Sequence, residues 1–120
     1  MFTVESIVLY VNDINASKKF YEQILEGEGL VLSPTFVSFN LSNLSLELKE
    51  KGSNIPEVTV TGGGAEICIK LANIEELEQV YKNWLASGIS MLQNITDVVY
   101  GLTFTASDLD EHRIRVFVEK

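Results

Sequence analysis

Polar and aromatic side chains alternate with aliphatic ones along several stretches that favour β-strands. Successive side chains of a strand point to opposite faces, so alternate residues share a face. One such face would collect the following residues: Ser6, Val8, Tyr10, Phe36, Ser38, Asn40, Ser45, Glu47, Glu66, Cys68, Lys70, Thr103, Thr105, Arg113, Arg115 and Phe117. This set is too polar for an ordinary core, and its aromatic rings would otherwise be exposed. We therefore expect a half-open ligand cleft, although a sheet face that simply meets solvent is the alternative.

An internal duplication explains how these residues could share a face. The stretches 6–22 and 66–82 share one pattern, with matched pairs that include Ile7/Ile67, Leu9/Ile69, Val11/Leu71 and Tyr21/Tyr81. Each copy alternates apolar residues with period two and then changes to helical spacing, which predicts a strand, a tight turn and a helix. Repetition of a whole unit along a chain indicates a duplicated architecture.

Three shorter strands are expected to follow the helix in each copy. The expected strands are 4–11, 30–33, 35–41 and 44–49, then 65–71, 89–96, 102–106 and 113–119, and the helices are 14–26 and 74–86. Residues 57–61 suit a strand extension. In our alignment 38–43 lies over 103–108, and 46–48 lies over 114–116. The sequence thus predicts an α+β fold of two tandem βαβββ modules, whose curved mixed sheet surrounds a cleft and whose helices cover the outer face.

We expect one domain, made of module one (1–50), a joint (51–64) and module two (65–120). The joint holds Gly52, Pro56 and the glycines 62–64, and it resembles a hinge more than a phosphate loop, because the Lys-Ser/Thr pair is missing.

Charge and composition exclude several classes of partner. The net charge is −8 and the nine basic residues are dispersed, so we expect no nucleic acid and no membrane surface as partners. Cys68 is the only cysteine, which rules out an internal disulfide. The first residues lack the features of a signal peptide, and a cytoplasmic location is expected.

Three motifs point to a family. They are VNDINASKKFY at 11–21, Tyr100-Gly101 before a strand, and DLDEHRIRVF at 108–117, which is similar to the family ending DPDGH-x-I-E-x-F. With its paired modules, the chain resembles the vicinal oxygen chelate superfamily of glyoxalase I, bleomycin resistance proteins and extradiol dioxygenases. The resemblance implies a homodimer and a cleft built from both halves, often at or near the subunit interface.

The resemblance also implies where a metal would bind. Metal-using members draw one ligand from each of four positions, which here hold Ser6, Glu47, Glu66 and Arg115. Glu47 matches the family, Glu66 stands where a histidine is usual, and Ser6 is a poor ligand. Arg115 departs decisively, because a protonated guanidinium has no lone pair for a metal.

We therefore expect Arg115 to lie between Glu47 and Glu66 in place of the cation, since guanidinium pairs well with carboxylates. The alternative is that Arg115 points to solvent and the two glutamates are independent surface charges.

Four further residues have plainer interpretations. His112, the only histidine, is expected in an exposed turn, and Cys68 as a small filler without a base to activate it. Trp84 lies on the apolar stripe of the second helix, which indicates a core residue. Tyr100 could cap a bound molecule at the mouth of the cleft.

The leading hypothesis is a metal-independent protein that binds a small organic molecule, in the manner of bleomycin-resistance-type members. Its ligand-binding residues would be Ser6, Tyr10, Phe36, Ser38, Glu47, Glu66, Tyr100, Thr103 and Arg115, without a cofactor. A second hypothesis is a metal-dependent lyase, isomerase or dioxygenase of the glyoxalase type, with Glu47 or Glu66 as the catalytic base. A third is a degenerate scaffold that only forms a dimer.

Overall fold

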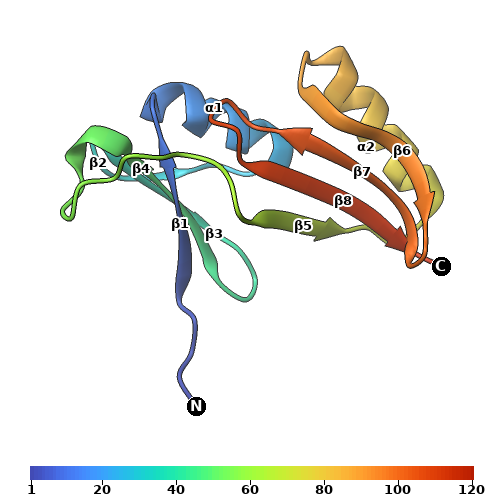
Figure 1. Cartoon of the computed structure of the whole chain (residues 1–120), viewed down its shortest axis with the longest axis horizontal. Helices are drawn as coiled ribbons and strands as arrows, with labels where there is room; N and C mark the ends of the chain where they lie inside the picture. Colours follow the sequence, from blue (N-terminus) through green and yellow to red (C-terminus); the bar gives the residue numbers. More distant parts are fainter. The chain divides into compact units, whose positions relative to one another are not determined.

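The computed structural model describes residues 1–120, which divide into two compact units, Met1–Gly62 and Gly63–Lys120. The elements of the first unit are β1 (Ser6–Val11), α1 (Ile14–Leu25), β2 (Leu30–Ser33), β3 (Phe36–Asn40), β4 (Ser45–Glu50) and the 3-10 turn η1 (Lys51–Ser53). Those of the second are β5 (Glu66–Lys70), α2 (Ile74–Ala86), β6 (Ser90–Val98), β7 (Gly101–Ser107) and β8 (Arg113–Glu119) (Figure 1).

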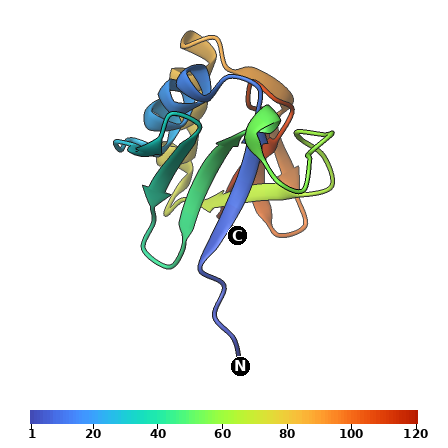
Figure 2. The same cartoon turned by 90° about the vertical axis from the view of Figure 1, so that its left-hand side faces the viewer.

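Both units have the same topology. The strand order is β1-β4-β3-β2 in the first sheet and β5-β8-β7-β6 in the second. In each sheet the first strand pairs in parallel with the last, and the remaining pairs are antiparallel, as the first sheet shows in Figure 2. The prediction of an α+β fold with two βαβββ modules is therefore confirmed.

One helix packs against one face of each sheet. α1 contacts β3 and β4, and α2 contacts β6 and β8. The buried apolar side chains of the first unit are Val11, Ile14, Tyr21, Ile24, Val37, Phe39, Leu46 and Leu48. In the second unit they are Leu77, Trp84, Ile89, Phe104, Ala106, Ile114, Val116 and Val118. Trp84 packs edge-to-face on Phe104 at 5.5 Å between ring centroids, which confirms Trp84 as a core residue.

Side-chain caps start both helices. Asp13 Oδ1 accepts from the Ala16 amide at 3.1 Å, and Asn73 Oδ1 accepts from the Glu76 amide at 2.9 Å. The predicted range of α2 agrees with the structure. α1 ends one residue earlier than predicted, and Glu26 adopts the left-handed conformation after it, with φ of 55°.

The predicted strand extension at 57–61 was wrong, because no strand lies between η1 and β5. Pro56 lacks the N–H that a ladder needs. Gly63 and Gly64 have φ of 126° and 76°, so the chain turns before β5 instead of continuing an extended course.

The register corrects our alignment of the repeats. Ser38 lies opposite Glu47, whereas Thr105 lies opposite Arg115. Glu47 of β4 and Arg115 of β8 occupy equivalent positions in the two sheets, so Ser38 corresponds to Thr105 and not to Thr103. The alignment is therefore wrong by two residues. Because this is an even number, the side chains of Ser38, Thr103 and Thr105 still belong to the expected face of their sheets.

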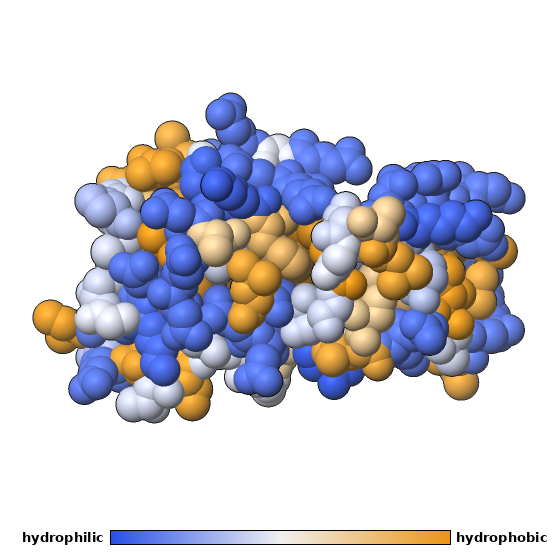
Figure 3. Space-filling model, turned by 90° about the horizontal axis from the view of Figure 1, so that it is seen from above, coloured by the Kyte–Doolittle hydropathy of each residue, from blue (hydrophilic) through white to orange (hydrophobic).

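The surface carries both hydrophilic and hydrophobic side chains, as the view in Figure 3 illustrates. In β2, Leu30, Val31 and Leu32 are each at least half exposed. None of the helices is both long and apolar enough to span a membrane.

Gly101 starts β7 in a position that no larger residue fits. Its φ is 156°, and an added Cβ would overlap the Val118 carbonyl oxygen of β8. We expect Gly101→Ala to lower the free energy of unfolding by about 1–3 kcal/mol through backbone strain, measured by urea denaturation. Gly52→Ala is the matched control, because no atom lies within 4 Å of the place that its added Cβ would take. Equal stability of the two variants would contradict this account.

Candidate ligand site on the second sheet

A two-point ion pair links β8 to β5. Arg115 Nε donates to Glu66 Oε2 at 3.0 Å, and Nη2 donates to Glu66 Oε1 at 3.2 Å. Arg115 therefore contacts Glu66, one of the two glutamates between which we expected it to lie, and its side chain does not simply point to solvent. The side chains of Arg115 and Glu66 are only 18% and 27% exposed, so the pair is partly shielded from water.

The parallel register explains the pairing. Arg115 lies opposite Cys68, and Glu66 lies opposite Arg113. Glu66 and Arg115 are therefore diagonal neighbours on one face, a separation that two long side chains can bridge. Arg113 Nε also reaches Glu66 Oε1 at 2.8 Å, so one carboxylate serves two guanidinium groups.

A polar network holds the other side of the guanidinium. Arg115 Nη1 donates to Gln93 Oε1 at 3.1 Å and to Thr103 Oγ1 at 3.2 Å. Thr105 Oγ1 donates to the same Gln93 oxygen at 3.1 Å, and Thr103 Oγ1 donates to the Val116 carbonyl at 2.9 Å. These contacts fix the plane of the guanidinium, because its donors have a rigid geometry.

Sequence reasoning did not find Gln93. Its strand, β6, shows register irregularities on both sides of Gln93, between Met91 and Gln93 and again before Thr96. Simple alternation fails across such irregularities. The signal that could have identified it is the pairing of Gln93 with Thr105, which no single-strand pattern reveals.

Mutual stabilisation shifts both pKa values. The hydrogen bond from Arg115 is the main cause that holds the pKa of Glu66 below its ordinary value, against an opposing effect of burial. The bond to Glu66 likewise raises the pKa of Arg115, and Tyr100 adds to this rise through a hydrogen bond and its charge interaction.

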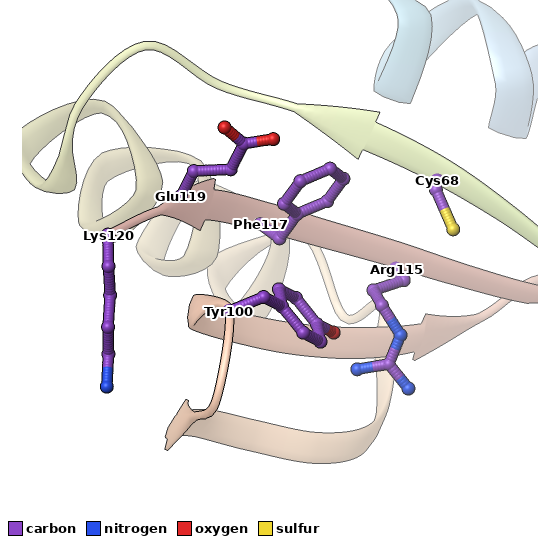
Figure 4. Close-up of a pocket in the computed structure, with 6 residues that line it drawn as sticks. All are labelled: Cys68, Tyr100, Arg115, Phe117, Glu119 and Lys120. Atoms are coloured by element: carbon purple, nitrogen blue, oxygen red, sulfur yellow. The ribbon is translucent and has the colours of Figure 1, made fainter.

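An open pocket of about 440 Å³ lies beside this network, entirely within the second unit. Its lining residues are Cys68, Tyr100, Arg115, Phe117, Glu119 and Lys120 (Figure 4). The rings of Tyr100 and Phe117 meet edge-to-face, with centroids 5.8 Å apart and planes at 88°. In Figure 4 the Tyr100 hydroxyl points toward the Arg115 guanidinium. The pocket thus joins an aromatic wall to a fixed positive charge.

The predicted site residues fall into the two units. Glu66, Tyr100, Thr103 and Arg115 come together in the second unit, around the ion pair and the pocket. The others belong to the first unit, where they are Ser6, Tyr10, Phe36, Ser38 and Glu47.

The first-unit residues share one face of their own sheet. Ser38 is opposite Glu47, and Phe36 is opposite Lys49, whose Nζ lies 5.5 Å from the Phe36 ring centroid. Tyr10 accepts a long hydrogen bond from Asn54 at 3.4 Å. Because Glu47 belongs to a different unit from Glu66 and Arg115, the predicted three-residue cluster stays a prediction.

These residues do not fit the metal that the resemblance implies. Both oxygens of Glu66 already accept from Arg115, and one also pairs with Arg113. Arg115 itself offers no lone pair to a cation. A divalent ion would have to break the ion pair and would then sit beside two fixed positive charges.

The prediction of an exposed His112 was wrong. His112 is buried, and its Nδ1 lies 2.7 Å from Asp108 Oδ2. Asp108 Oδ1 accepts from the amides of Asp110 and His112, each at 2.8 Å. The Asp108 carboxylate therefore holds the loop in a tight turn and keeps the His112 imidazole in a buried position. Cys68 is exposed and lines the pocket.

Comparisons with known proteins agree with this architecture. A family model described as "Glyoxalase/Bleomycin resistance protein/Dioxygenase superfamily" matches residues 3–116. The chain belongs to this superfamily. A curated relative, the phenazine antibiotic resistance protein EhpR of Enterobacter agglomerans, is 30% identical over 113 residues, which cover 91% of this chain and 86% of EhpR.

Solved structures of other proteins are also similar to this chain. A protein from Agrobacterium tumefaciens, determined by solution NMR, shares 36% identity with a TM-score of 0.89, over 100% of this chain and 99% of its own. A glyoxalase-related enzyme from Fulvimarina pelagi has a TM-score of 0.88 at 18% identity, over 99% of this chain and 89% of its own. At that identity the likeness concerns the fold alone.

The lowered pKa of Glu66 predicts a pH-dependent contribution to stability. A carboxyl whose folded-state pKa is depressed stabilises the fold above its unfolded pKa, roughly 4.3, and this contribution is lost as pH falls through the folded value. We expect the difference in unfolding free energy between wild type and Glu66→Gln to be largest near neutral pH and to shrink in acid. Urea denaturation across pH measures it.

Glu78→Gln, on the exposed surface of α2, controls for the loss of one carboxylate. If both variants show the same pH profile, the ion pair does not stabilise the fold as described.

Proposed function

We propose that the protein binds a small organic molecule without a metal, as a sequestering, resistance-type member of its superfamily. The observation that carries the proposal is the ion pair of Arg115 with Glu66 at a position where the resemblance places metal ligands. A metal would act there as a Lewis acid through open coordination positions. The guanidinium supplies a fixed positive charge whose donors are directed mainly at protein oxygens.

The pocket supports binding for a second reason. Its volume of about 440 Å³ lies within the range of ~300–1,000 Å³ that is usual for small-molecule sites. Phe117 and Tyr100 offer ring surface, while Arg115 and the Tyr100 hydroxyl offer polar contacts. Apolar walls with a few fixed polar groups are typical of sites that recognise organic ligands.

The name of one relative suggests where to begin the search for ligands. EhpR is described as a phenazine antibiotic resistance protein, and phenazine is a flat aromatic heterocycle. A flat molecule of this kind suits the aromatic wall of the second unit. Phenazine and a library of planar aromatic compounds are therefore the first probes.

Calorimetric titration of phenazine tests the proposal. We expect binding that is unchanged, within about twofold, by a chelator or by added zinc, nickel or manganese, and a ligand-dependent rise in Tm. Phe117→Leu should weaken binding at least about fivefold through lost stacking, whereas Leu92→Ala, an exposed apolar residue of β6 outside the pocket lining, should not.

Three outcomes would contradict the proposal. Binding that requires a metal, or metal-dependent turnover of a thiohemiacetal, would favour the glyoxalase-type enzyme instead. If neither phenazine nor any library compound raises Tm, the protein is a scaffold without a ligand.

The proposal includes a homodimer in the cytoplasm. The homodimer follows from the family resemblance, and sequestration of a toxic compound is most useful inside the cell. Light scattering after size-exclusion chromatography should give twice the chain mass of 13.4 kDa, and a monomer at all concentrations would contradict it. Cell fractionation with an antibody against the protein tests the location.

A further inference from the structure

The face of the second sheet that α2 does not cover, its open face, is locally positive, although the protein as a whole is acidic. Its ionisable side chains on β5 and β8 are Glu66, Lys70, Arg113, Arg115 and Glu119, three basic and two acidic. The whole chain, in contrast, has nine basic and 17 acidic residues. The local balance of +1 therefore opposes the overall charge of −8.

The surplus charge lies at the ion pair. Glu66 serves both Arg113 and Arg115, so the three side chains together carry one net positive charge. Further along the same strands Lys70 pairs with Glu119 at 3.3 Å, and that pair is neutral. Arg115 is the less exposed of the two arginines, and its charge is least screened by water where it lines the pocket.

Tyr100 places a hydrogen-bond donor in the pocket beside this positive charge. Its hydroxyl points toward the guanidinium, as Figure 4 shows, and the two groups form a hydrogen bond. A phenol oxygen that accepts from arginine keeps its own O–H to donate. The proton of that hydroxyl is then directed away from Arg115. A carboxylate oxygen is the acceptor best matched to a phenol O–H beside a positive charge.

The aromatic wall defines the rest of the ligand. Because Tyr100 and Phe117 meet edge-to-face, one ring presents its face while the other presents its edge. A flat ring can stack on the exposed face and approach the edge of the second ring. Lys120 and Glu119 also line the pocket, but each has an ion-pair partner, Asp97 at 3.1 Å and Lys70 at 3.3 Å, so the unbalanced positive charge is that of the arginines.

We propose that the pocket of the second unit selects planar aromatic carboxylates over their neutral and cationic analogues. The ring lies against Phe117 and Tyr100, and the carboxylate accepts from the Tyr100 hydroxyl beside Arg115. This inference rests on the proposed function and specifies the chemical class of its ligand.

A charge-matched series tests the selectivity by calorimetry at neutral pH and low salt. The probes are naphthalene-2-carboxylate, naphthalene-2-carboxamide and naphthalene-2-carboxamidine, which share one ring system. We expect the carboxylate to bind at least about tenfold more tightly than the carboxamide, and the carboxamidine to bind most weakly. Added salt should reduce the difference through screening.

Two variants locate the effect. Tyr100→Phe keeps the ring and should weaken carboxylate binding about tenfold but carboxamide binding less than about threefold. Arg113→Gln, which lies outside the pocket lining, should reduce the preference for the carboxylate by removing the surplus charge. Lys82→Gln on α2 removes one positive charge from the opposite side of the unit and should leave the preference unchanged. Circular dichroism confirms that each variant folds.

The outcomes separate this inference from the proposed function. If phenazine binds but the carboxylate has no advantage over the carboxamide, the selectivity is wrong and metal-free binding stands. If Lys82→Gln reduces the preference as much as Arg113→Gln, overall charge and not the site sets it, and the inference fails. If neither phenazine nor any naphthalene probe binds, both proposals fail.

Discussion

The two-point contact between Arg115 and Glu66 organises the open face of the second sheet. It ties the first strand of the unit to the last and leaves the guanidinium in a single plane, held by Gln93 and Thr103. Partial burial strengthens each bond but also removes hydration from the charges, so the net gain in stability is small. The main effect is geometric, because the positive charge stays at one place beside the aromatic wall.

Duplication gives the chain two sheets of the same topology with different chemistry on their open faces. Glu47 occupies in β4 the position that Arg115 occupies in β8, and Ser6 corresponds to Glu66. The core faces changed little, since both remain aliphatic and aromatic under a helix. The polar faces are free to diverge because packing does not restrict them in the same way. The equivalent positions thus differ in charge, with a carboxylate in the first unit and a guanidinium in the second.

Most of the fold could be predicted from the sequence, because alternation, helical spacing and capping residues all indicate the same elements. Asp13 and Asn73 cap the helices as their types suggest, and α2 has its predicted bounds. The elements and their caps depend on short-range pattern, which a single sequence displays. The contact of Arg115 with Glu66 was expected on other grounds, because the family resemblance places both residues at metal-ligand positions and a guanidinium pairs well with carboxylates.

Other features depend on long-range geometry and were missed. Gln93 joins the network only through an irregular register in β6, and His112 is buried because the Asp108 side chain folds its loop. The alignment of 38–43 with 103–108 was wrong by two residues, because it allowed three extra residues between the last two strands of the second unit where the structure has one. Neither loop geometry nor register irregularity leaves a periodic signal.

We propose that a guanidinium holds the place at Glu66 that a cation takes in metal-using relatives. Carboxyl carbon NMR of Glu66 during a zinc titration, with the Arg115 Nε–H signal recorded in parallel, tests this most directly. We expect that neither signal shows a saturable change. A Glu66 shift that saturates at one equivalent of zinc, together with loss of the Arg115 signal, would contradict it.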